Sequence, residues 1–446
     1  MAGVTGIFPS GSERDVVITG MGLITPLGRS LDENWRSLKA GMTGIDRHPR
    51  EGAPLSLEYC GRVSGLNALA DLPGKLVSQT RFLNRGSLLG FEAAREAMRL
   101  ADLNPDAVLP ERRALYVASG DLTNVGCAFM HPAMRDEAVR DGEEAGAFDF
   151  ERFNKAVLDR VNPFFLLESI HNNLFSFLSA AVRFMGPNTS MASLSPCGSH
   201  ALELAARSIA DGDADVALAV GCGCWLSDVS LHEMRGLGIL SACREGARSF
   251  RPFDRERDGF IPAEGGAAVL LEPAGSAEKR GARIWGRIEG FGNRMESAIS
   301  RGVGVPAQVG RGSMLMALEE AGCGLQDLAF ISPHGSATVK GDRAELRAVA
   351  EILGDSGLRL PVCGLKPYTG HMAAASDIAE VIFGLMAVCD GMAPGTPNFE
   401  KAEREFDSLR ISASHRAVEK SRFLSTSYGI LGESSSVVVE AVLRRP

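Results

Sequence analysis

Ser195 and Cys197 stand where an extended segment is expected to give way to a helix. Gly186-Pro187 opens a run that we expect to be extended as far as Ser195, and His200–Ile209 has helical spacing. Free backbone N–H groups and the positive end of the helix dipole at such a turn stabilise an anionic nucleophile and a carbonyl oxygen. Such a turn suits a nucleophile, but this segment taken alone favours an N-cap serine beside a buried cysteine. The nucleophile interpretation gains its support from the two segments described next.

Two histidines and one lysine follow the ends of expected strands. His334 ends the apolar stretch LAFISP, just ahead of the hydroxyl residues Ser336 and Thr338. Lys366 and His371 follow the apolar PVCGL in the same way. Glycine-flanked loops at strand ends are common binding sites, so these side chains are predicted to share one pocket. No carboxylate or cysteine stands at helical ligand spacing from either histidine, so the pattern does not favour a metal.

The elements that must position these residues alternate between strands and helices. The run VVITGMGLITPLG after Asp15 predicts a strand and a loop, and LDENWRSLKAG predicts a helix that begins after Ser30. A second helix is expected over Ser87–Leu103, followed by a strand at ALYVASG. This order is typical of an α/β protein with buried, largely parallel strands.

A charge-rich stretch of mixed sign interrupts the alternation at about residues 122–162 and is interpreted as a surface insertion with helical character. Near Pro273 the alternation starts again, with a strand in ARIWGRIEGFG, a helix over Arg311–Gly322 and a strand in LAFIS. The order of elements therefore predicts two duplicated halves, 15–272 and 273–446, after an N-terminal extension at 1–14. No close sequence repeat supports the duplication.

Composition narrows the class of protein. The 446 residues carry 47 Lys and Arg against 55 Asp and Glu, a net charge of −8, which argues against a nucleic-acid partner. No apolar run reaches the roughly 18 to 20 residues of a membrane span, so no membrane partner is expected. The first residues lack the basic start and long apolar stretch of a signal peptide.

The nine cysteines, an odd number scattered over a long chain, suit reduced thiols in the cytoplasm. Cys222 and Cys224 form a close pair, but no second Cys or His pair stands at ligand spacing from them. We interpret them as core thiols on a strand. Neither a metal nor a cofactor is predicted.

Seven stretches of the chain, from Asp15 to the C-terminus, resemble one family. They are VVITGMGLITPLG, NPFFLLESIHNN, GPNTSM, AARSIADGDADVALAVG, RPFDRERDGFIPAEGGAAVLLE, HGSATVKGDRAEL and LKPYTGHMAAASDIAEVI. In these stretches the chain resembles the elongating β-ketoacyl-acyl-carrier-protein synthases of the thiolase superfamily. The resemblance implies a five-layered αβαβα fold from two duplicated halves. It also implies an obligate dimer, either a homodimer or a heterodimer with a ketosynthase.

The resemblance also implies roles for the site. In the family, a cysteine at a helix start attacks an acyl thioester, and two histidines decarboxylate the malonyl group and hold the enolate oxygen. A lysine supports the histidines, hydroxyls contact the pantetheine arm, and an acidic residue lies near the lysine. The matching residues here are His334, His371, Lys366, Ser336, Thr338 and Glu345. Because a buried lysine needs a charged partner, Lys366 is expected to pair with Glu345.

The family's nucleophilic cysteine falls on Ser195 in this chain. Counting nine positions forward from Gly186, or ten back from Ala205, reaches Ser195 without a gap, and Cys197 lies two positions too late. Cys197 would serve only if the turn slipped by two residues. A helix N-terminus converts a thiol to a thiolate, whereas a serine hydroxyl needs a base. His334 or His371 is expected to supply it.

A second departure lies in the family's gate loop. Where the family has G-F-G-G-T-N, this chain has Gly429–Ser434, with Ile430 at the position of the swinging phenylalanine. The family's oxyanion hole uses the backbone N–H of that phenylalanine and of the nucleophile, which Ile430 and Ser195 could keep. We therefore expect the entry of the acyl chain to be controlled differently from that in the family. A positive rim for the acidic carrier protein is expected at Arg235, Arg244 and Arg248.

Two functions from different classes follow. The first is an acyltransferase of the 3-oxoacyl-ACP synthase type, acting on acyl- and malonyl-carrier-protein thioesters in fatty acid or polyketide biosynthesis, with Ser195 in place of the thiol. The second is a non-catalytic partner subunit, similar to a chain-length factor, of a cysteine-bearing ketosynthase. An acyl-binding or O-acylating relative remains a third interpretation. The first is favoured because both histidines and the lysine are present.

Overall fold

The computed structural model describes residues 13–50, 53–66, 72, 74–120, 130–131, 133–134, 149–165, 173–193, 195–297, 305–354 and 358–443. Eleven strands of the described chain form one large sheet, and two strand pairs lie apart from it. The strands are β1 Val16–Ile24, β2 Ile45–Arg47, β3 Tyr59–Gly61, β4 Arg113–Ser119, β5 Asn188–Ala192, β6 Val216–Cys224, β7 Glu264–Pro273, β8 Gly286–Met295, β9 Leu328–Ser332, β10 Pro361–Val362, β11 Met392–Ala393, β12 Arg410–Ile411, β13 Arg416–Ala417, β14 Arg422–Tyr428 and β15 Glu433–Ala441.

The strand order shows the duplication that the sequence predicts. The sheet runs β12-β10-β9-β14-β15-β8-β1-β7-β6-β4-β5, and its two halves meet where β1 pairs with β8. From that seam outward, the strands of the two halves follow the same order. In the N-terminal half the order is β1, β7, β6, β4 and β5. In the C-terminal half it is β8, β15, β14, β9 and β10, with β12 at the edge. The boundary between 272 and 273 remains a prediction, since only the strand order bears on it.

The sheet is mixed, and the prediction of largely parallel strands was wrong. Among the described strands of the large sheet, five pairings are parallel. The other five pairings are antiparallel. Strands that are buried on both faces have continuous apolar sequences whatever their direction. The apolar runs therefore do not distinguish parallel from antiparallel pairing.

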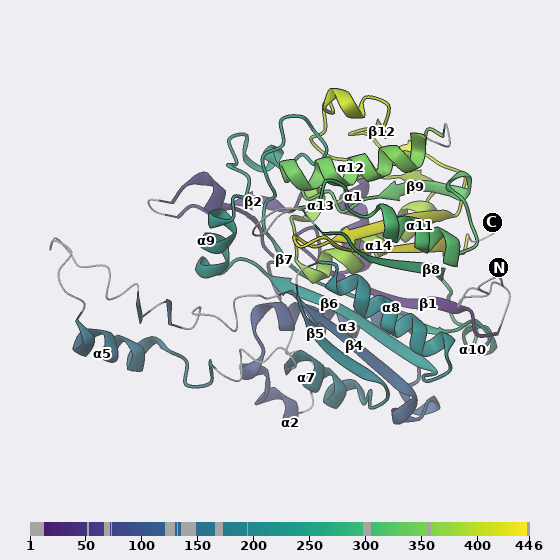
Figure 1. Cartoon of the computed structure of the whole chain (residues 1–446). Coiled ribbons are helices and arrows are strands. Elements are labelled where there is room, and N and C mark those ends of the chain that lie inside the picture. Colours follow the sequence, from purple (N-terminus) through teal and green to yellow (C-terminus); the bar gives the residue numbers. More distant parts are fainter. Residues whose placement is uncertain are drawn as a thin grey trace.

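Helices complete five layers (Figure 1). A central core packs α8 and α14 between the two halves of the sheet. A second core packs α3 and α7 on the outer face of the N-terminal half, and a third packs α11 and α12 on the outer face of the C-terminal half. The αβαβα architecture is thus confirmed. The helices are α1 Leu31–Lys39, α2 Gly74–Val77, α3 Arg85–Ala101, α5 Phe150–Arg160, α7 Asn173–Val182, α8 Cys197–Ala210, α9 Asp228–Gly236, α10 Ala274–Lys279, α11 Arg311–Glu320, α12 Val339–Gly354, α13 Lys366–Thr369 and α14 Ala374–Cys389.

A side-chain hydrogen bond caps the first turn of α1 and of α3. The Ser30 side chain accepts a hydrogen bond from the Glu33 N–H and caps α1, and Asn84 caps α3 in the same way through the Ser87 N–H. Helix α8 begins at Cys197, three residues before the predicted start at His200. This earlier start brings the first turn of α8 directly behind Ser195.

The predicted insertion at about 122–162 lies partly outside the described residues. Its described end contains α5, capped by the Asp149 carboxylate, which confirms helical character there. No residue of α5 is buried, and Phe150 and Leu158 are 71% and 85% exposed. Figure 1 shows α5 standing away from the sheet. None of the helices in the described part of the chain is long and apolar enough to cross a bilayer.

Candidate active site

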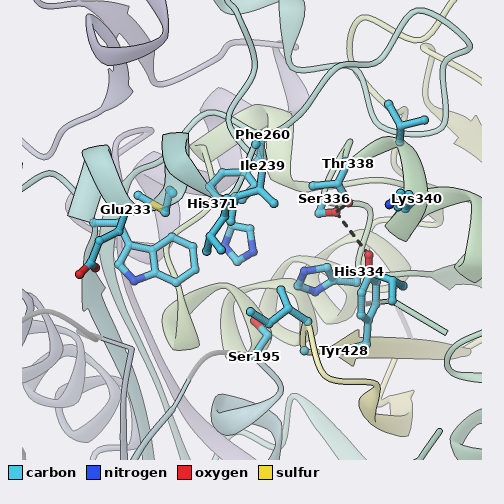
Figure 2. Close-up of a pocket in the computed structure, with 18 of the residues that line it drawn as sticks. Ser195, Glu233, Ile239, Phe260, His334, Ser336, Thr338, Lys340, His371 and Tyr428 are labelled. Carbon is cyan, nitrogen blue, oxygen red and sulfur yellow. Dashed lines mark hydrogen bonds between the residues drawn. The ribbon is translucent and has the colours of Figure 1, made fainter. Parts of the chain in front are cut away.

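A cavity of about 440 Å³ brings the predicted site residues together. Its walls include Ser195 from the start of α8, His334 from the loop after β9, and His371 from the loop before α14. Figure 2 shows these three side chains around one space. Ser336, Thr338, Tyr428 and Ile430 line the same cavity.

Glu345 fixes the loop that carries His334. This buried carboxylate on α12 accepts hydrogen bonds from the backbone N–H groups of His334, at 2.6 Å, and Gly335, at 2.9 Å. Gly335 has a φ of 56°, which glycine adopts without strain. Burial raises the pKa of Glu345 to about 8, although the two N–H donors oppose the shift.

His371 is held by backbone and by aromatic contacts. Its N–H donates to the Ile261 carbonyl, and its own carbonyl accepts from the Ala263 N–H, each at 2.9 Å. The imidazole packs against Trp225 and Phe260, with ring centroids 4.8 and 5.0 Å away. The His334 ring lies edge-on to it at 5.1 Å. Two ladder-like backbone bonds and three ring contacts therefore fix the orientation of His371.

Lys366 pairs with Glu380, so the predicted pairing with Glu345 was wrong. The Lys366 Nζ lies 2.8 Å from Glu380 Oε1, 2.6 Å from the His334 carbonyl oxygen and 3.2 Å from His334 Nδ1. These three acceptors use the three N–H bonds of the ammonium. Both carboxylate oxygens of Glu345 instead accept hydrogen bonds from the backbone N–H groups that follow β9.

Both imidazoles are neutral at pH 7. Complete burial and then the Lys366 charge lower the pKa of His334 and His371 well below the usual 6.5, and His371 adds to the effect on His334. Because an ammonium only donates, His334 Nδ1 must accept from Lys366. The ring proton of His334 therefore sits on Nε2.

Ser195 lines the cavity, whereas Cys197 lies in the core between the sheets. Burial, and then the charge of Asp377, raise the pKa of the Cys197 thiol to about 12. A thiol with such a pKa is a poor nucleophile at pH 7. Within the described residues, the Ser195 hydroxyl makes no hydrogen bond that meets normal geometry, to either histidine or to another group.

Three hydroxyls gather on one wall of the cavity. Ser336 Oγ lies 2.9 Å from Thr338 Oγ1 and 3.4 Å from the Tyr428 hydroxyl (Figure 2). The Tyr428 ring also stacks at an angle on His334, with centroids 4.7 Å apart. Burial raises the pKa of Tyr428, so its hydroxyl remains protonated and able to donate.

The loop between β14 and β15 closes the cavity beside Ser195. Gly429 and Glu433 are joined by a 2.8 Å backbone hydrogen bond, and Gly429 packs on the Ser195 backbone so closely that a Cβ there would lie 2.5 Å from the Ser195 carbonyl oxygen. Ile430 follows and reaches the cavity. In the described residues, no hydrogen bond uses the backbone N–H of Ser195 or Ile430.

Two family profiles together match most of the chain. The profile "Beta-ketoacyl synthase, N-terminal domain" matches residues 13–277, and the profile "Beta-ketoacyl synthase, C-terminal domain" matches residues 287–400. The chain belongs to the β-ketoacyl synthase family.

Curated relatives in this family match over nearly their full lengths. The 3-oxoacyl-[acyl-carrier-protein] synthase 2 of Vibrio cholerae is 27% identical over 441 residues, covering 96% of this chain and 99% of the relative. The protein of the same name from Coxiella burnetii is 27% identical over 432 residues, with the same two coverages.

Solved β-ketoacyl synthases share the fold. A β-ketoacyl synthase from Burkholderia phymatum superimposes with a TM-score of 0.79 at 25% identity, covering 96% of this chain and 99% of that one. The ishigamide ketosynthase/chain length factor superimposes with a TM-score of 0.79 at 21% identity, covering 97% of this chain and 100% of that one. At that identity the second comparison shows the fold alone.

The sequence interpretation missed three residues that line or support the cavity. Glu380 holds Lys366, Tyr428 joins the hydroxyl group of the cavity wall, and Trp225 packs on His371. A signal existed for Glu380, because Asp377 and Glu380 are the only charged residues in the otherwise apolar helix α14. Buried carboxylates within such a helix require a partner or a function. No group of three potential metal ligands occurs among the described residues.

Proposed function

We propose that this chain is an acyltransferase of the 3-oxoacyl-ACP synthase type that decarboxylates malonyl thioesters and acylates Ser195. The observation that carries the proposal is the shared cavity of Ser195, His334 and His371, with both imidazoles neutral and Lys366 paired behind them. The pairing of Lys366 with Glu380 orients His334 through its Nδ1 and its carbonyl oxygen. Such a site stabilises negative charge that develops on a bound substrate during the reaction.

Decarboxylation follows from this arrangement. The malonyl carboxylate leaves as carbon dioxide when the bond to its α-carbon breaks, and the bonding pair passes into an enolate on the thioester. The Nε2–H of His334 donates to the enolate oxygen, with His371 beside it. Neutral donors suit this step because they need no proton transfer from solvent. Ser336, Thr338 and Tyr428 supply hydroxyl contacts for the pantetheine arm.

Acyl transfer uses Ser195. Its hydroxyl attacks the acyl thioester carbonyl, the carbon–sulfur bond breaks, and the free thiol of the carrier leaves. Both Ser195 and Ile430 line the cavity, and their unbonded N–H groups are the proposed donors to the oxyanion. An oxygen ester is a weaker electrophile towards an enolate than a thioester, so condensation is slower here than hydrolysis or decarboxylation.

An acyl carrier protein is the proposed partner, because the curated relatives are named as synthases of acyl-carrier-protein substrates. A dimer is the proposed assembly. Helix α5 supports it, since the exposed Phe150 and Leu158 would be covered by a second subunit, of the same chain or of a ketosynthase.

A non-catalytic partner subunit is the second candidate. It is supported by the Ser195 hydroxyl, which hydrogen-bonds to neither histidine. The two imidazoles do not activate a serine to which they form no hydrogen bond. A subunit that only shapes the acyl tunnel of its partner would need no activated serine.

The test is the purified chain with malonyl-carrier protein and no other synthase. Carbon dioxide and acetyl-carrier protein are measured, and release that His334→Ala abolishes supports the enzyme. The control is Glu96→Gln, a buried carboxylate on α3 that caps backbone N–H groups away from the cavity. Release that occurs only after a cysteine-bearing ketosynthase is added supports the partner subunit and contradicts the enzyme.

A further inference from the structure

A buried carboxylate stands directly behind Ser195. Asp377, on α14, is 1% exposed, and its Oδ2 accepts a 2.9 Å hydrogen bond from the Gly198 N–H in the first turn of α8. Burial raises the pKa of this carboxyl, the Lys366 charge opposes the shift, and the hydroxyls of Ser195 and Ser427 approach closely enough to oppose it further. The sequence interpretation gave Asp377 no role.

Three polar atoms at this point remain unsatisfied. Ser195 Oγ, Asp377 Oδ1 and Ser427 Oγ are buried and form no hydrogen bond of normal geometry with any described residue. An unsatisfied buried polar group destabilises the fold, so three in one place call for an explanation. A group that must accept a proton during a reaction keeps an oxygen free for it.

Helix α8 packs closely on the start of α14 at Gly198. A Cβ at Gly198 would collide first with the Ala374 carbonyl oxygen and would also lie 2.9 Å from Asp377 Cβ and 3.1 Å from Asp377 Oδ2, so only glycine fits at this position. The first turn of α8 therefore holds Asp377 with one oxygen, through Gly198, and leaves the other free. Because the donor to Asp377 is a backbone N–H group of α8, it cannot rotate away as a side chain can.

Among the other candidate bases, His371 Nδ1 and Glu380 Oε2 also have no hydrogen-bond partner in the described residues, but neither bonds to Ser195, whereas the Ser195 hydroxyl approaches Asp377. His334 Nδ1 faces the Lys366 ammonium, and neither imidazole hydrogen-bonds to Ser195. Glu380 pairs with Lys366, and both oxygens of Glu345 accept backbone N–H groups. Among the described buried acids around the cavity, Asp377 is thus the one in contact with Ser195 that keeps an oxygen free.

The geometry points to Asp377 as the general base that accepts the proton of the Ser195 hydroxyl during acylation. This inference rests on the proposed acylation of Ser195. Oδ1 takes the proton as Oγ bonds to the thioester carbonyl carbon. When the tetrahedral intermediate collapses, the carbon–sulfur bond breaks and the protonated Asp377 returns the proton to the departing thiolate. The products are the serine ester and the free carrier thiol, and the two histidines are left for the malonyl group.

A carboxylate suits serine and opposes cysteine. A cysteine must ionise before it attacks, and a neighbouring negative charge hinders ionisation, as the contribution of Asp377 to the raised pKa of Cys197 illustrates. A serine hydroxyl is never ionised at pH 7 and loses its proton only as it attacks. Removing the charge of Asp377 should therefore slow a serine and speed a cysteine at position 195.

The first experiment measures acylation. Wild-type protein, Asp377→Asn and the control Glu96→Gln are incubated with acetyl, hexanoyl and dodecanoyl N-acetylcysteamine thioesters, and ester formation on Ser195 is followed by peptide mass spectrometry. Asp377→Asn keeps an oxygen for the Gly198 N–H and is expected to lower the acylation rate about 10²- to 10⁴-fold. The control should acylate like the wild type. Asp377→Ser is the second variant if the amide does not fold.

The second experiment exchanges the nucleophile. Alkylation by iodoacetamide at position 195 is compared between Ser195→Cys and Ser195→Cys/Asp377→Asn at pH 7. The double variant is expected to react about tenfold faster, the effect of one pKa unit on thiolate population. A structural role for Asp377 would slow both nucleophiles or neither.

The outcomes separate the two proposals. If Asp377→Asn acylates Ser195 as fast as the wild type, the general-base role is overturned and Ser195 remains the nucleophile. If the wild type forms no ester but still releases carbon dioxide from malonyl-carrier protein, the role of Asp377 is overturned together with that of Ser195, and decarboxylation stands. If neither reaction occurs, both proposals fail.

Discussion

The Lys366 ammonium lies 2.8 Å from the Glu380 carboxylate, and both side chains are at most 3% exposed. The two residues sit on different helices, α13 and α14, on either side of the loop that carries His371. The ion pair therefore fixes that loop from both ends, while the remaining N–H bonds of Lys366 fix His334. One buried pair thus positions both imidazoles.

Breaking this pair should destabilise the fold. Lys366→Met leaves Glu380 buried without its cation, and we expect the free energy of unfolding to fall by about 3 to 5 kcal/mol. Lys366→Met/Glu380→Gln removes both charges and should recover most of that loss. Denaturation in urea measures both values. A single variant as stable as the wild type would contradict the pairing.

The pH dependence of decarboxylation should report the Lys366 charge. The pKa of His334 and His371 is lowered well below 6.5, so both rings stay neutral and the rate should remain constant from about pH 8 down to 6.5. In Lys366→Met/Glu380→Gln the rings lose the repelling cation, so the acid limb of the rate profile should move to higher pH. Carbon dioxide release, followed from pH 8 down into the acid limb of both proteins, provides the measurement.

The same lowered pKa values have a consequence for stability. Below about pH 6.5 the unfolded chain takes up protons on these imidazoles while the folded chain does not, so their contribution to stability falls as the pH falls. The effect is measured as the difference in unfolding free energy between pH 7 and pH 5. It should be smaller in His371→Gln than in the wild type, and an equal difference in the two proteins would contradict the assignment.

The order of elements could be predicted from the sequence because each buried strand is a short apolar run bounded by Gly or Pro. The run VALAVGCGC of β6 is one example, and EGGAAVLLEP of β7 is another. Strand direction could not be predicted, because both faces of these strands are buried and the two directions bury the same side chains. Antiparallel pairing of β6 with β7 emerges only from the folded topology.

The positions of His334 and His371 could also be predicted, because both follow strand ends in glycine-containing loops. The sequence marks Asp377 and Glu380 as charged residues of an otherwise apolar helix, but it does not say which carboxylate pairs with Lys366. Glu345 lies on α12 and Glu380 on α14, and only the folded structure shows that the carboxylate from α14 meets the ammonium. Asp377 was missed for the same reason, since its meaning depends on the first turn of α8, which arrives from a distant part of the chain.

Restoring a thiol should restore condensation. Ser195→Cys places a better nucleophile and a more electrophilic acyl group in the same cavity, so formation of 3-ketoacyl-carrier protein should rise above the wild-type level. Liquid chromatography of the carrier-bound products gives the rate. If the rate does not change, Ser195→Cys/Ile430→Phe tests whether the loop after β14 is the remaining obstacle to acyl entry.

The Tyr428 hydroxyl should contribute to binding of the malonyl substrate. Tyr428→Phe removes one hydroxyl from the group formed with Ser336 and Thr338, and the KM for malonyl-carrier protein should rise about fivefold, the effect of about 1 kcal/mol. The kcat should change little. Tyr116→Phe, a buried tyrosine on β4, is the matched control. A changed kcat at constant KM would contradict a binding role.

Docking of the carrier protein should depend on positive side chains near the mouth of the cavity. Arg235 is exposed on α9, whose residues Glu233 and Met234 line the cavity, and Lys340 lines it from α12. Of the other predicted rim residues, Arg244 is exposed, and Arg248 lies 3.5 Å from Glu400, which partly neutralises it.

Reversal of charge at Arg235, Arg244 and Lys340 to glutamate should therefore weaken the binding of an acidic carrier protein, most strongly at low salt, because screening weakens contacts between exposed charges. Lys279→Glu is the control, since it reverses an exposed charge on α10, which Figure 1 places at the opposite side of the molecule from α9. Affinity is measured by fluorescence anisotropy of labelled carrier protein at two salt concentrations. Equal affinity for the triple variant and the control at low salt would place the docking surface elsewhere on the molecule.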